Sequence, residues 1–231
     1  MDAVPARCAE LLAQGEVDVA LVPAIEYQRI PGLTVVSGVC VASREKVRSV
    51  ILASKLDELK NIRTVALDES SRTSAALIKI IFREFLSFEP KWVSTAPDLN
   101  SMLVDNDAAL LIGDPAMTFP RQGLNIIDLA GLWRKYTGLG FVFALWMIGS
   151  NASPESRVID LAGACAEGLE REAEIVDFYE PKLGLSRREL ETYLRENITF
   201  YLDAELHAGL NLFYKLAHKH SLIPALRPLN L

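Results

Sequence analysis

The sequence predicts a two-lobed α/β fold followed by a helical region, and two observations support that prediction. The first is a pattern that occurs twice: a helix, an aspartate, an apolar strand and a proline. The copies end in VDVALVP at residues 17–23 and in AALLIGDP at residues 108–115. The second observation is helical periodicity in the segments after residue 152. Two such α/β units indicate two similar lobes whose strand ends meet at a shared ligand-binding edge.

Each element is predicted from local signals. Strands are expected from their apolar content at residues 17–23, 34–43, 48–54, 63–67, 108–115 and 140–149. Helices are expected at residues 5–13, where proline begins the helix and Gly15 ends it, and at residues 97–107, 153–182, 186–197 and 203–223. The helix at 186–197 opens with a capping box, a serine followed three residues later by a glutamate.

The lobes are expected to be joined by crossing strands, because no Gly/Ser-rich linker divides the chain. Residues 48–54 and 140–149 are the predicted hinge. The predicted division therefore places residues 1–55 and 145–231 in lobe 1 and residues 56–144 in lobe 2.

Composition excludes several classes of protein. The chain has 231 residues, half of them hydrophobic, which is enough for two cores. The net charge is −6 and no run of five or six basic residues occurs, so we expect no nucleic-acid partner. The longest apolar run, residues 138–149, is too short to span a bilayer. We therefore expect no membrane insertion and, since no secretory signal is visible, a cytoplasmic location.

Cysteines and histidines show no catalytic or metal-binding pattern. Cys8, Cys40 and Cys165 are odd in number and far apart, so they are expected to be reduced packing residues rather than zinc ligands or disulfides. All three histidines fall in the last predicted helix, away from the strand ends. Hydroxyls, backbone amides and carboxylates such as Asp68 and Asp114 are therefore the expected chemistry of the site.

The stretch VALDESSRTSAAL, residues 65–77, joins an apolar strand to an alanine-rich helix. A helix start carries unpaired amides and the positive end of the helix dipole, which attract carboxylates and phosphates. Ser70, Ser71, Thr73 and Ser74 stand at or beside this first turn, whereas an N-cap requires one hydroxyl. The pattern fits either a small-anion site or one capping serine with solvated neighbours.

Two further residues allow two interpretations each. Arg72 can grip a carboxylate bidentately, or it can lie on the exposed helix face with Lys79 and Arg83, which is the arrangement we expect. Asp114 follows the second repeated strand. It either caps the turn ahead of Pro115, or has a functional role, which would be to orient a substrate hydroxyl or to take a proton.

Six segments, in order, closely resemble the chorismate dehydratase family of menaquinone biosynthesis and together cover nearly the whole chain. They are DVALVPAIEY (18–27), IPGL (30–33), VRSVIL (47–52), VALDESSRTSAAL (65–77), DAALLIGDPAM (107–117) and LWRKYTGLGFVFALW (132–146). The SSRTS and IGDPA portions are the most specific.

This resemblance implies a fold like the type II periplasmic binding proteins, used here for catalysis. It implies removal of water from chorismate to give 3-[(1-carboxyvinyl)oxy]benzoate, the first committed step of the futalosine route to menaquinone. It also implies that no metal or organic cofactor is needed. The small-molecule partner would be a dianion, which suits a helix-terminus site in an acidic protein.

The resemblance also implies the residues of the site. Those expected to bind substrate are Pro23, Ala24, Ser71, Thr73, Ser74 and Gly113. Ser49 and Asp114 are assigned to catalysis, although spacing alone predicts an outward-facing strand position for Ser49. The related naphthoate synthase family carries a histidine at the position of Asp114, so the aspartate favours the dehydratase.

Two features depart from the family pattern. Family members begin with a strand ending in a Ser-Phe/Tyr-Leu-Asn segment, whereas Met1 falls after that region, so we expect that strand to be missing and a sheet edge to be exposed. Gly140 stands where the family has proline, which is expected to loosen that turn. The alternative function is a non-catalytic small-anion solute-binding protein of the same fold.

Overall fold

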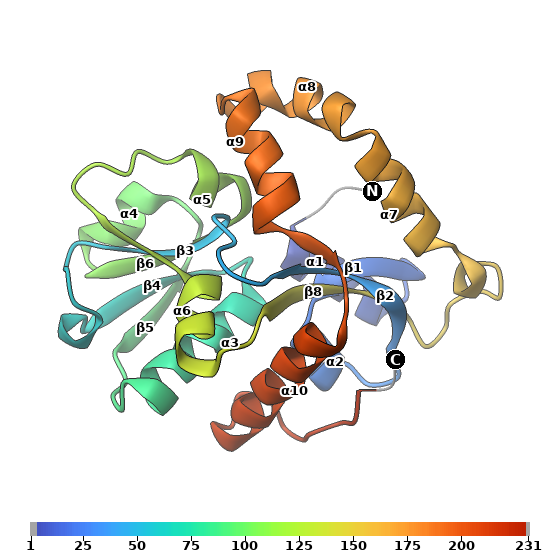
Figure 1. Ribbon diagram of the computed structural model, residues 1–231. Helices are drawn as coiled ribbons and strands as arrows, with labels where there is room; N and C mark the ends of the chain where they lie inside the picture. The colour runs from blue at the N-terminus through green and yellow to red at the C-terminus, as the bar shows by residue number, and fades with distance from the viewer. Residues whose placement is uncertain (1–3, 230–231) are drawn as a thin grey trace.

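The apolar strands assemble into two β-sheets. The computed structural model describes residues 4–229, and Figure 1 shows the two sheets beside each other with helices packed around them. Sheet A has the strand order β1-β8-β2-β9, and sheet B has the order β5-β4-β6-β3-β7. The strands are β1 (Val19–Pro23), β2 (Thr34–Ser43), β3 (Val50–Ser54), β4 (Thr64–Asp68), β5 (Lys91–Thr95), β6 (Ala108–Ile112), β7 (Asn125–Asp128), β8 (Phe141–Ile148) and β9 (Thr199–Tyr201).

Every predicted strand is present, and three more were missed. These are β5, β7 and β9, whose residues are mostly half-exposed or exposed. Such strands lack the continuous apolar run that identifies a buried strand in a sequence. β1 lies at an edge of sheet A and pairs with β8 alone within the described part of the chain.

All the predicted helices are present, mostly with shorter bounds, and three more were missed, at Glu26–Arg29, Gly113–Thr118 and Leu129–Thr137. They are α1 (Pro5–Gln14), α2 (Glu26–Arg29), α3 (Arg72–Ile80), α4 (Leu99–Val104), α5 (Gly113–Thr118), α6 (Leu129–Thr137), α7 (Leu161–Glu170), α8 (Glu172–Leu183), α9 (Arg187–Thr192) and α10 (Ala204–Lys219). Gly15 ends α1 in the left-handed conformation, and Ser186 forms the predicted capping box with Glu189. The helical stretch predicted at 153–182 is instead divided into two helices at Arg171.

Strand pairing shows that the chain passes from one sheet to the other just outside the two strands that were predicted to form the hinge. β3 pairs with β6 and β7 inside sheet B, and β8 pairs with β1 and β2 inside sheet A. The chain therefore crosses at residues 44–49 and 138–140, so the hinge prediction was wrong by a few residues. The lobe boundaries near residues 55 and 145 stay a prediction, and the pairing favours boundaries slightly earlier at both places.

The second crossing is packed tightly against α10. A Cβ added to Gly209 of α10 would lie 2.2 Å from the carbonyl oxygen of Gly140, and one added to Gly140 would lie 2.7 Å from Leu206. Trp133 also donates from its indole nitrogen to the Gly140 oxygen at 3.2 Å. Gly140 therefore stands at a close backbone approach rather than in a loosened turn.

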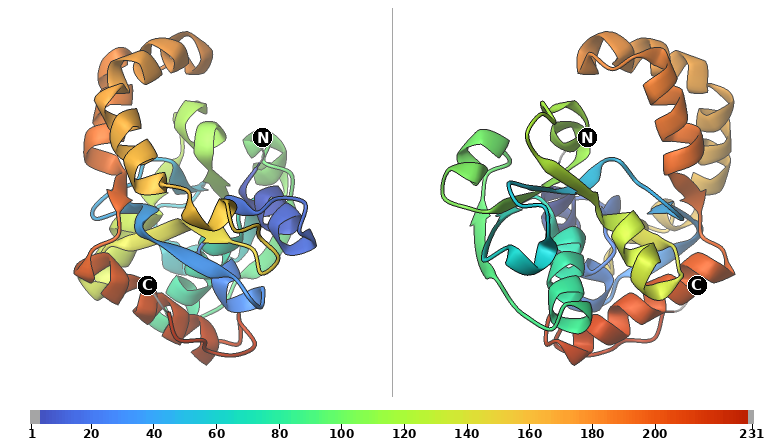
Figure 2. Two further views of the ribbon diagram at one scale, coloured as in Figure 1. Left: turned by 90° about the vertical axis from the view of Figure 1, so that its right-hand side faces the viewer. Right: turned by 60° about the vertical axis from the view of Figure 1, so that its left-hand side comes forward.

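The helices α7, α8 and α9 form an arch that projects from sheet A and comes down beside α5 of the sheet B lobe (Figures 1 and 2). Val176 of α8 and Leu190 of α9 are buried against Met117 of α5 in one hydrophobic cluster. The arch therefore contacts both lobes. Across residues 4–229, no helix combines the length and apolar content that crossing a membrane requires.

Candidate functional site

One edge of sheet B gathers most of the predicted site residues. β4 and β6 are parallel neighbours, so their carboxyl ends meet there, and antiparallel β3 begins at the same edge. Ser49 precedes β3 and Gly113 follows β6, and the Gly113 amide donates to the Ser49 carbonyl at 2.8 Å. The start of α3, after β4, lies two strands away from Ser49, a separation of roughly 10 Å.

The hydroxyls at the start of α3 are buried rather than solvated. Ser71, Thr73 and Ser74 are each about 5% exposed or less. Ser71 occupies the N-cap position but makes no capping hydrogen bond, and its buried Oγ has no hydrogen-bond partner among residues 4–229. Of the two alternatives left open by the sequence, a capping serine is therefore not what the structure shows at Ser71.

The end of β1 in sheet A faces this helix start. The Ile25 amide donates to the Thr73 hydroxyl oxygen at 3.2 Å, which joins the two lobes directly. Pro23 and Ala24 are buried immediately before Ile25. Ala24 is held from both sides, since its amide donates to the Phe143 carbonyl and its carbonyl accepts from Tyr214. The Ile25–Thr73 hydrogen bond thus brings Pro23 and Ala24 to the start of α3, whereas Ser49, Gly113 and Asp114 lie along the same edge of sheet B, toward the arch.

The turn before Ser49 has a constrained backbone. Arg48 has a φ of 63°, a left-handed conformation that costs a non-glycine residue on the order of 1–3 kcal/mol. The Asp128 carboxylate holds this turn by accepting from the Val47 amide at 3.2 Å and the Arg48 amide at 2.7 Å. This carboxylate also caps α6 through Gly131. The position of Ser49 is therefore fixed by surrounding structure.

A tyrosine from the arch completes the environment of Ser49. Tyr193, in the π-helical turn η4 (Tyr193–Asn197) that continues α9, donates to Ser49 Oγ at 2.9 Å. Arg48 forms a second link to the arch through Glu189, at 2.7 Å. Sequence reasoning missed both contacts, because 144 residues separate Tyr193 from Ser49 and only the fold brings them together.

Asp114 lies in the first turn of α5 and is exposed, with no capping hydrogen bond at that helix start. It lines a cavity of about 300 Å³ between α5 and the arch, together with Met117, Tyr179 and Tyr193. The capping role considered for Asp114 is therefore not what the structure shows. The carboxylate instead borders a space large enough for a small ring.

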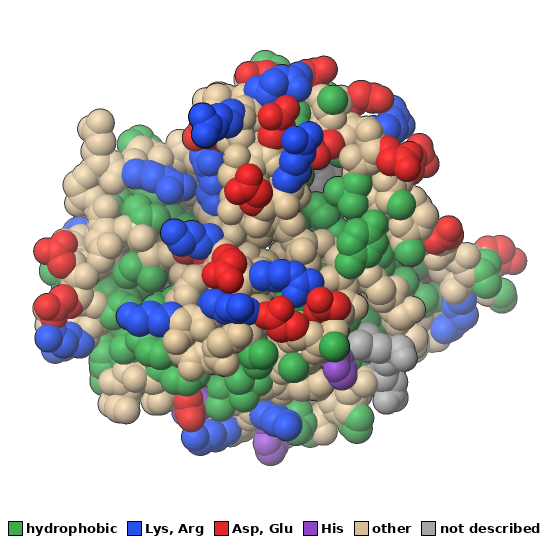
Figure 3. All heavy atoms as spheres, viewed as in Figure 1, with side chains coloured by type: hydrophobic (Ala, Val, Ile, Leu, Met, Phe, Trp, Pro, Cys, Tyr) green, Lys and Arg blue, Asp and Glu red, His purple; other side chains and the backbone are tan. Residues whose placement is uncertain are grey.

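Arg72 was expected to be exposed, but its side chain is half-buried. Its guanidinium pairs with Glu10 at 2.8 Å and with the buried Glu26 at 3.4 Å, so its charge is already matched by protein carboxylates. On the face of the molecule seen in Figure 3, basic and acidic side chains are interspersed. Any anion at the lobe junction must therefore be held mainly by amides and hydroxyls.

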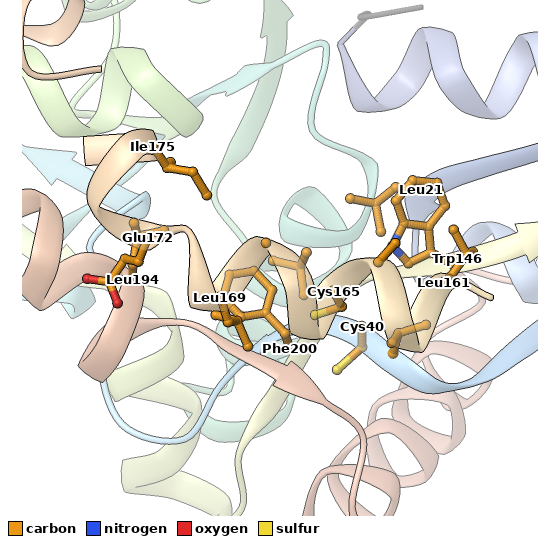
Figure 4. Close-up of a pocket in the computed structure, with 14 residues that line it drawn as sticks. Leu21, Cys40, Trp146, Leu161, Cys165, Leu169, Glu172, Ile175, Leu194 and Phe200 are labelled. Carbon is orange, nitrogen blue, oxygen red and sulfur yellow. The ribbon is translucent and has the colours of Figure 1, made fainter. Parts of the chain in front are cut away.

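A second cavity, of about 320 Å³, lies away from these residues between α7 and sheet A (Figure 4). Its walls are almost entirely apolar, including Leu21, Trp146 and Leu169, and none of the predicted site residues lines it. Burial raises the pKa of Cys40, which faces this cavity, to about 12, so its thiol stays protonated. Such a cavity offers few hydrogen-bond donors to a dianion.

No group of three His, Cys, Asp or Glu side chains within residues 4–229 is arranged to hold a metal ion. The polar groups that the described structure brings to the lobe junction are hydroxyls, amides, one phenol and the exposed Asp114 carboxylate. This set is suited to binding an oxyanion and to orienting a hydroxyl.

The two sheets and the polar groups between them define a two-lobed α/β protein with a fold like that of the periplasmic solute-binding proteins. The fold resembles that of a protein of Archaeoglobus fulgidus, with a TM-score of 0.76 and 19% identity over 96% of this chain and 86% of that one. It also resembles the periplasmic aliphatic sulphonate binding protein of Escherichia coli, with a TM-score of 0.61 and 16% identity over 98% of this chain and 78% of that one.

Sequence comparison specifies the family. The family model described as menaquinone biosynthesis matches residues 1–219. The chorismate dehydratase of Thermus thermophilus is 32% identical over 232 residues, which cover 92% of this chain and 84% of that protein. This chain belongs to the menaquinone biosynthesis family.

Proposed function

We propose that this protein is a chorismate dehydratase, a hydro-lyase that makes 3-[(1-carboxyvinyl)oxy]benzoate in the cytoplasm. One observation carries the proposal beyond family membership: Ser71 holds a buried hydroxyl without a partner at the start of α3, on the same sheet edge as Ser49. Burying an unpaired hydroxyl is costly, and since Ser43 also carries one at the end of β2, it is the combination with a helix start that points to a ligand at Ser71. Its position at a helix N-terminus suits a carboxylate.

The binding roles follow from the donors at the junction. Ser71, Ser74 and the first amides of α3 would hold one carboxylate of chorismate. Thr73 accepts from the Ile25 amide, so its own proton stays available for the same carboxylate. Pro23, Ala24 and Gly113 would shape the walls of the site. These roles need no cation, in agreement with Arg72 already being paired.

The reaction removes a ring C–H proton and expels a ring hydroxyl, which leave together as water. The ring then becomes aromatic, so the elimination is strongly favourable. We assign Ser49 to the departing hydroxyl, because it can donate a hydrogen bond as negative charge develops on that oxygen. The enolpyruvyl carboxylate of the substrate would accept the ring proton and pass it to the departing hydroxide, so that water leaves and the carboxylate is regenerated, and Asp114 would orient the ring. Catalysis would then come mainly from positioning and preorganised donors.

The test is to incubate the purified protein with chorismate, to follow the loss of its diene absorbance and to identify the aromatic product. We expect turnover by the native protein and a loss of kcat of at least tenfold in Ser49→Ala. Ser43→Ala is the matched control, because Ser43 is equally buried but ends β2 in sheet A. Full activity of Ser49→Ala would refute the role of that serine. Tight binding of chorismate with no product would favour the non-catalytic solute-binding alternative.

A further inference from the structure

The hydrogen bond between the arch and Ser49 matters for the chemistry because Ser49 is its acceptor. Tyr193 donates its phenol proton to Ser49 Oγ at 2.9 Å, and no other hydrogen bond engages that oxygen in the described structure. A serine hydroxyl has one proton and two lone pairs. Because Ser49 accepts from Tyr193, its own proton is free to point to another acceptor.

The backbone of Ser49 is already fixed, which leaves only the side chain to be oriented. The Ser49 amide donates to the Val47 carbonyl at 2.7 Å, and the Ser49 carbonyl accepts from Gly113 at 2.8 Å. The hydroxyl can still occupy three rotamers and turn its proton freely. A single directional partner is therefore enough to select the orientation, and Tyr193 is that partner.

Tyr193 is itself held in place and kept protonated. It lies in the turn that continues α9, and Leu190 of that helix is buried against Met117. The Arg48–Glu189 ion pair ties the same two segments together one residue before Ser49. Burial raises the pKa of Tyr193 above its ordinary value of 10, so the phenol remains a donor at neutral pH.

We propose that Tyr193 is a positioning residue for Ser49: its phenol turns the serine proton toward the departing hydroxyl of the substrate. This inference rests on the proposed dehydratase function. Tyr193 acts through Ser49 and does not take the substrate's proton. Each hydrogen bond in such a chain polarises the next, so Ser49 becomes a stronger donor than a lone hydroxyl.

A double-mutant cycle tests the proposal. Tyr193→Phe keeps the ring and removes only the phenol oxygen, and we expect kcat to fall about tenfold with KM changed less than threefold. In the Tyr193→Phe/Ser49→Ala double variant, kcat should be no lower than in Ser49→Ala alone. Tyr136→Phe is the matched control, since Tyr136 lies in α6, where its ring stacks on Phe85 and lines neither cavity described above, and its kcat should stay within twofold of the native value.

The outcomes separate this inference from the function on which it rests. If Tyr193→Phe keeps full kcat while Ser49→Ala loses activity, the positioning role is overturned and the dehydratase assignment stands. If the losses of the single variants multiply in the double variant, Tyr193 acts independently of Ser49 and the inference is again overturned. If the native protein does not turn over chorismate, the proposed function fails first.

Discussion

Removal of the Ser71 hydroxyl should separate its structural effect from its functional effect. The Oγ atom is buried and has no hydrogen-bond partner in the described part of the chain. Burying an unpaired hydroxyl costs about 1–3 kcal/mol in proteins. Ser71→Ala removes that cost and no hydrogen bond, so we expect the free energy of unfolding to stay equal or to rise by up to about 1 kcal/mol.

The effect on substrate should have the opposite sign. A hydrogen bond to a charged group contributes about 1.5–3 kcal/mol, and 1.4 kcal/mol corresponds to a tenfold change in affinity. We therefore expect Ser71→Ala to weaken chorismate binding by about tenfold or more. Urea unfolding would measure the stability of the variant, and initial rates against chorismate concentration would measure KM.

Ser43 provides the comparison. Its hydroxyl is also buried without a partner, but it lies at the end of β2 in sheet A. Ser43→Ala should match Ser71→Ala in stability and leave KM unchanged. The reasoning would be refuted if Ser71→Ala lost more than 1 kcal/mol of stability, because the hydroxyl would then have a structural partner. An unchanged KM would equally remove Ser71 from the binding site.

Three further predictions test the fold around the site. Thr73→Val should lower the free energy of unfolding by about 1–3 kcal/mol, because it leaves the buried Ile25 amide unpaired. Thr73→Asn supplies another acceptor for that amide, and urea unfolding of both variants would show whether the acceptor reduces the loss. Gly209→Ala should lower the free energy of unfolding by about 1–3 kcal/mol, although alanine has the better helix propensity, because the alanine Cβ would lie 2.2 Å from the Gly140 carbonyl oxygen. A higher melting temperature of this variant would contradict the packing described. The pKa of Glu189 is lowered from 4.5 to about 2, first by Arg48 and then by Ser186, so its contribution to stability is full above pH 4.5 and is lost as pH falls toward 2. Glu189→Gln should flatten that dependence between pH 5 and pH 2 in urea titrations, and an unchanged slope would show that the ion pair adds nothing.

Local signals were sufficient where a single segment determines its own structure. The apolar run at 34–43 forms β2 with those bounds, Gly15 ends α1, and the capping box at Ser186 starts α9. These features depend on backbone hydrogen bonds and dihedral preferences within a few residues. β5 and β9 were not predicted, because a strand without a continuous apolar run is recognised mainly by the strands that pair with it, and the sequence does not show that pairing.

The candidate site was predictable only in part, for the same reason. The hydroxyl-rich junction before Leu77 identified the helix start, but not that Thr73 would meet Ile25 or that Ser71 would be left without a partner. Arg72 was expected to be exposed because a helical pattern gives the face of a residue and not what packs against that face. Its two glutamate partners come from α1 and α2, more than 40 residues away.

By itself, the sequence determined the two α/β units, the hydroxyl cluster at a helix start and the family to which the chain belongs. These follow from short-range periodicity, end signals and recognisable motifs. Only the tertiary structure decided that β3 begins at the sheet edge where β4 and β6 end, and that the arch places Tyr193 against Ser49. The physical reason is that hydrogen bonds between distant segments depend on how sheets and helices pack, and packing is a property of the whole chain.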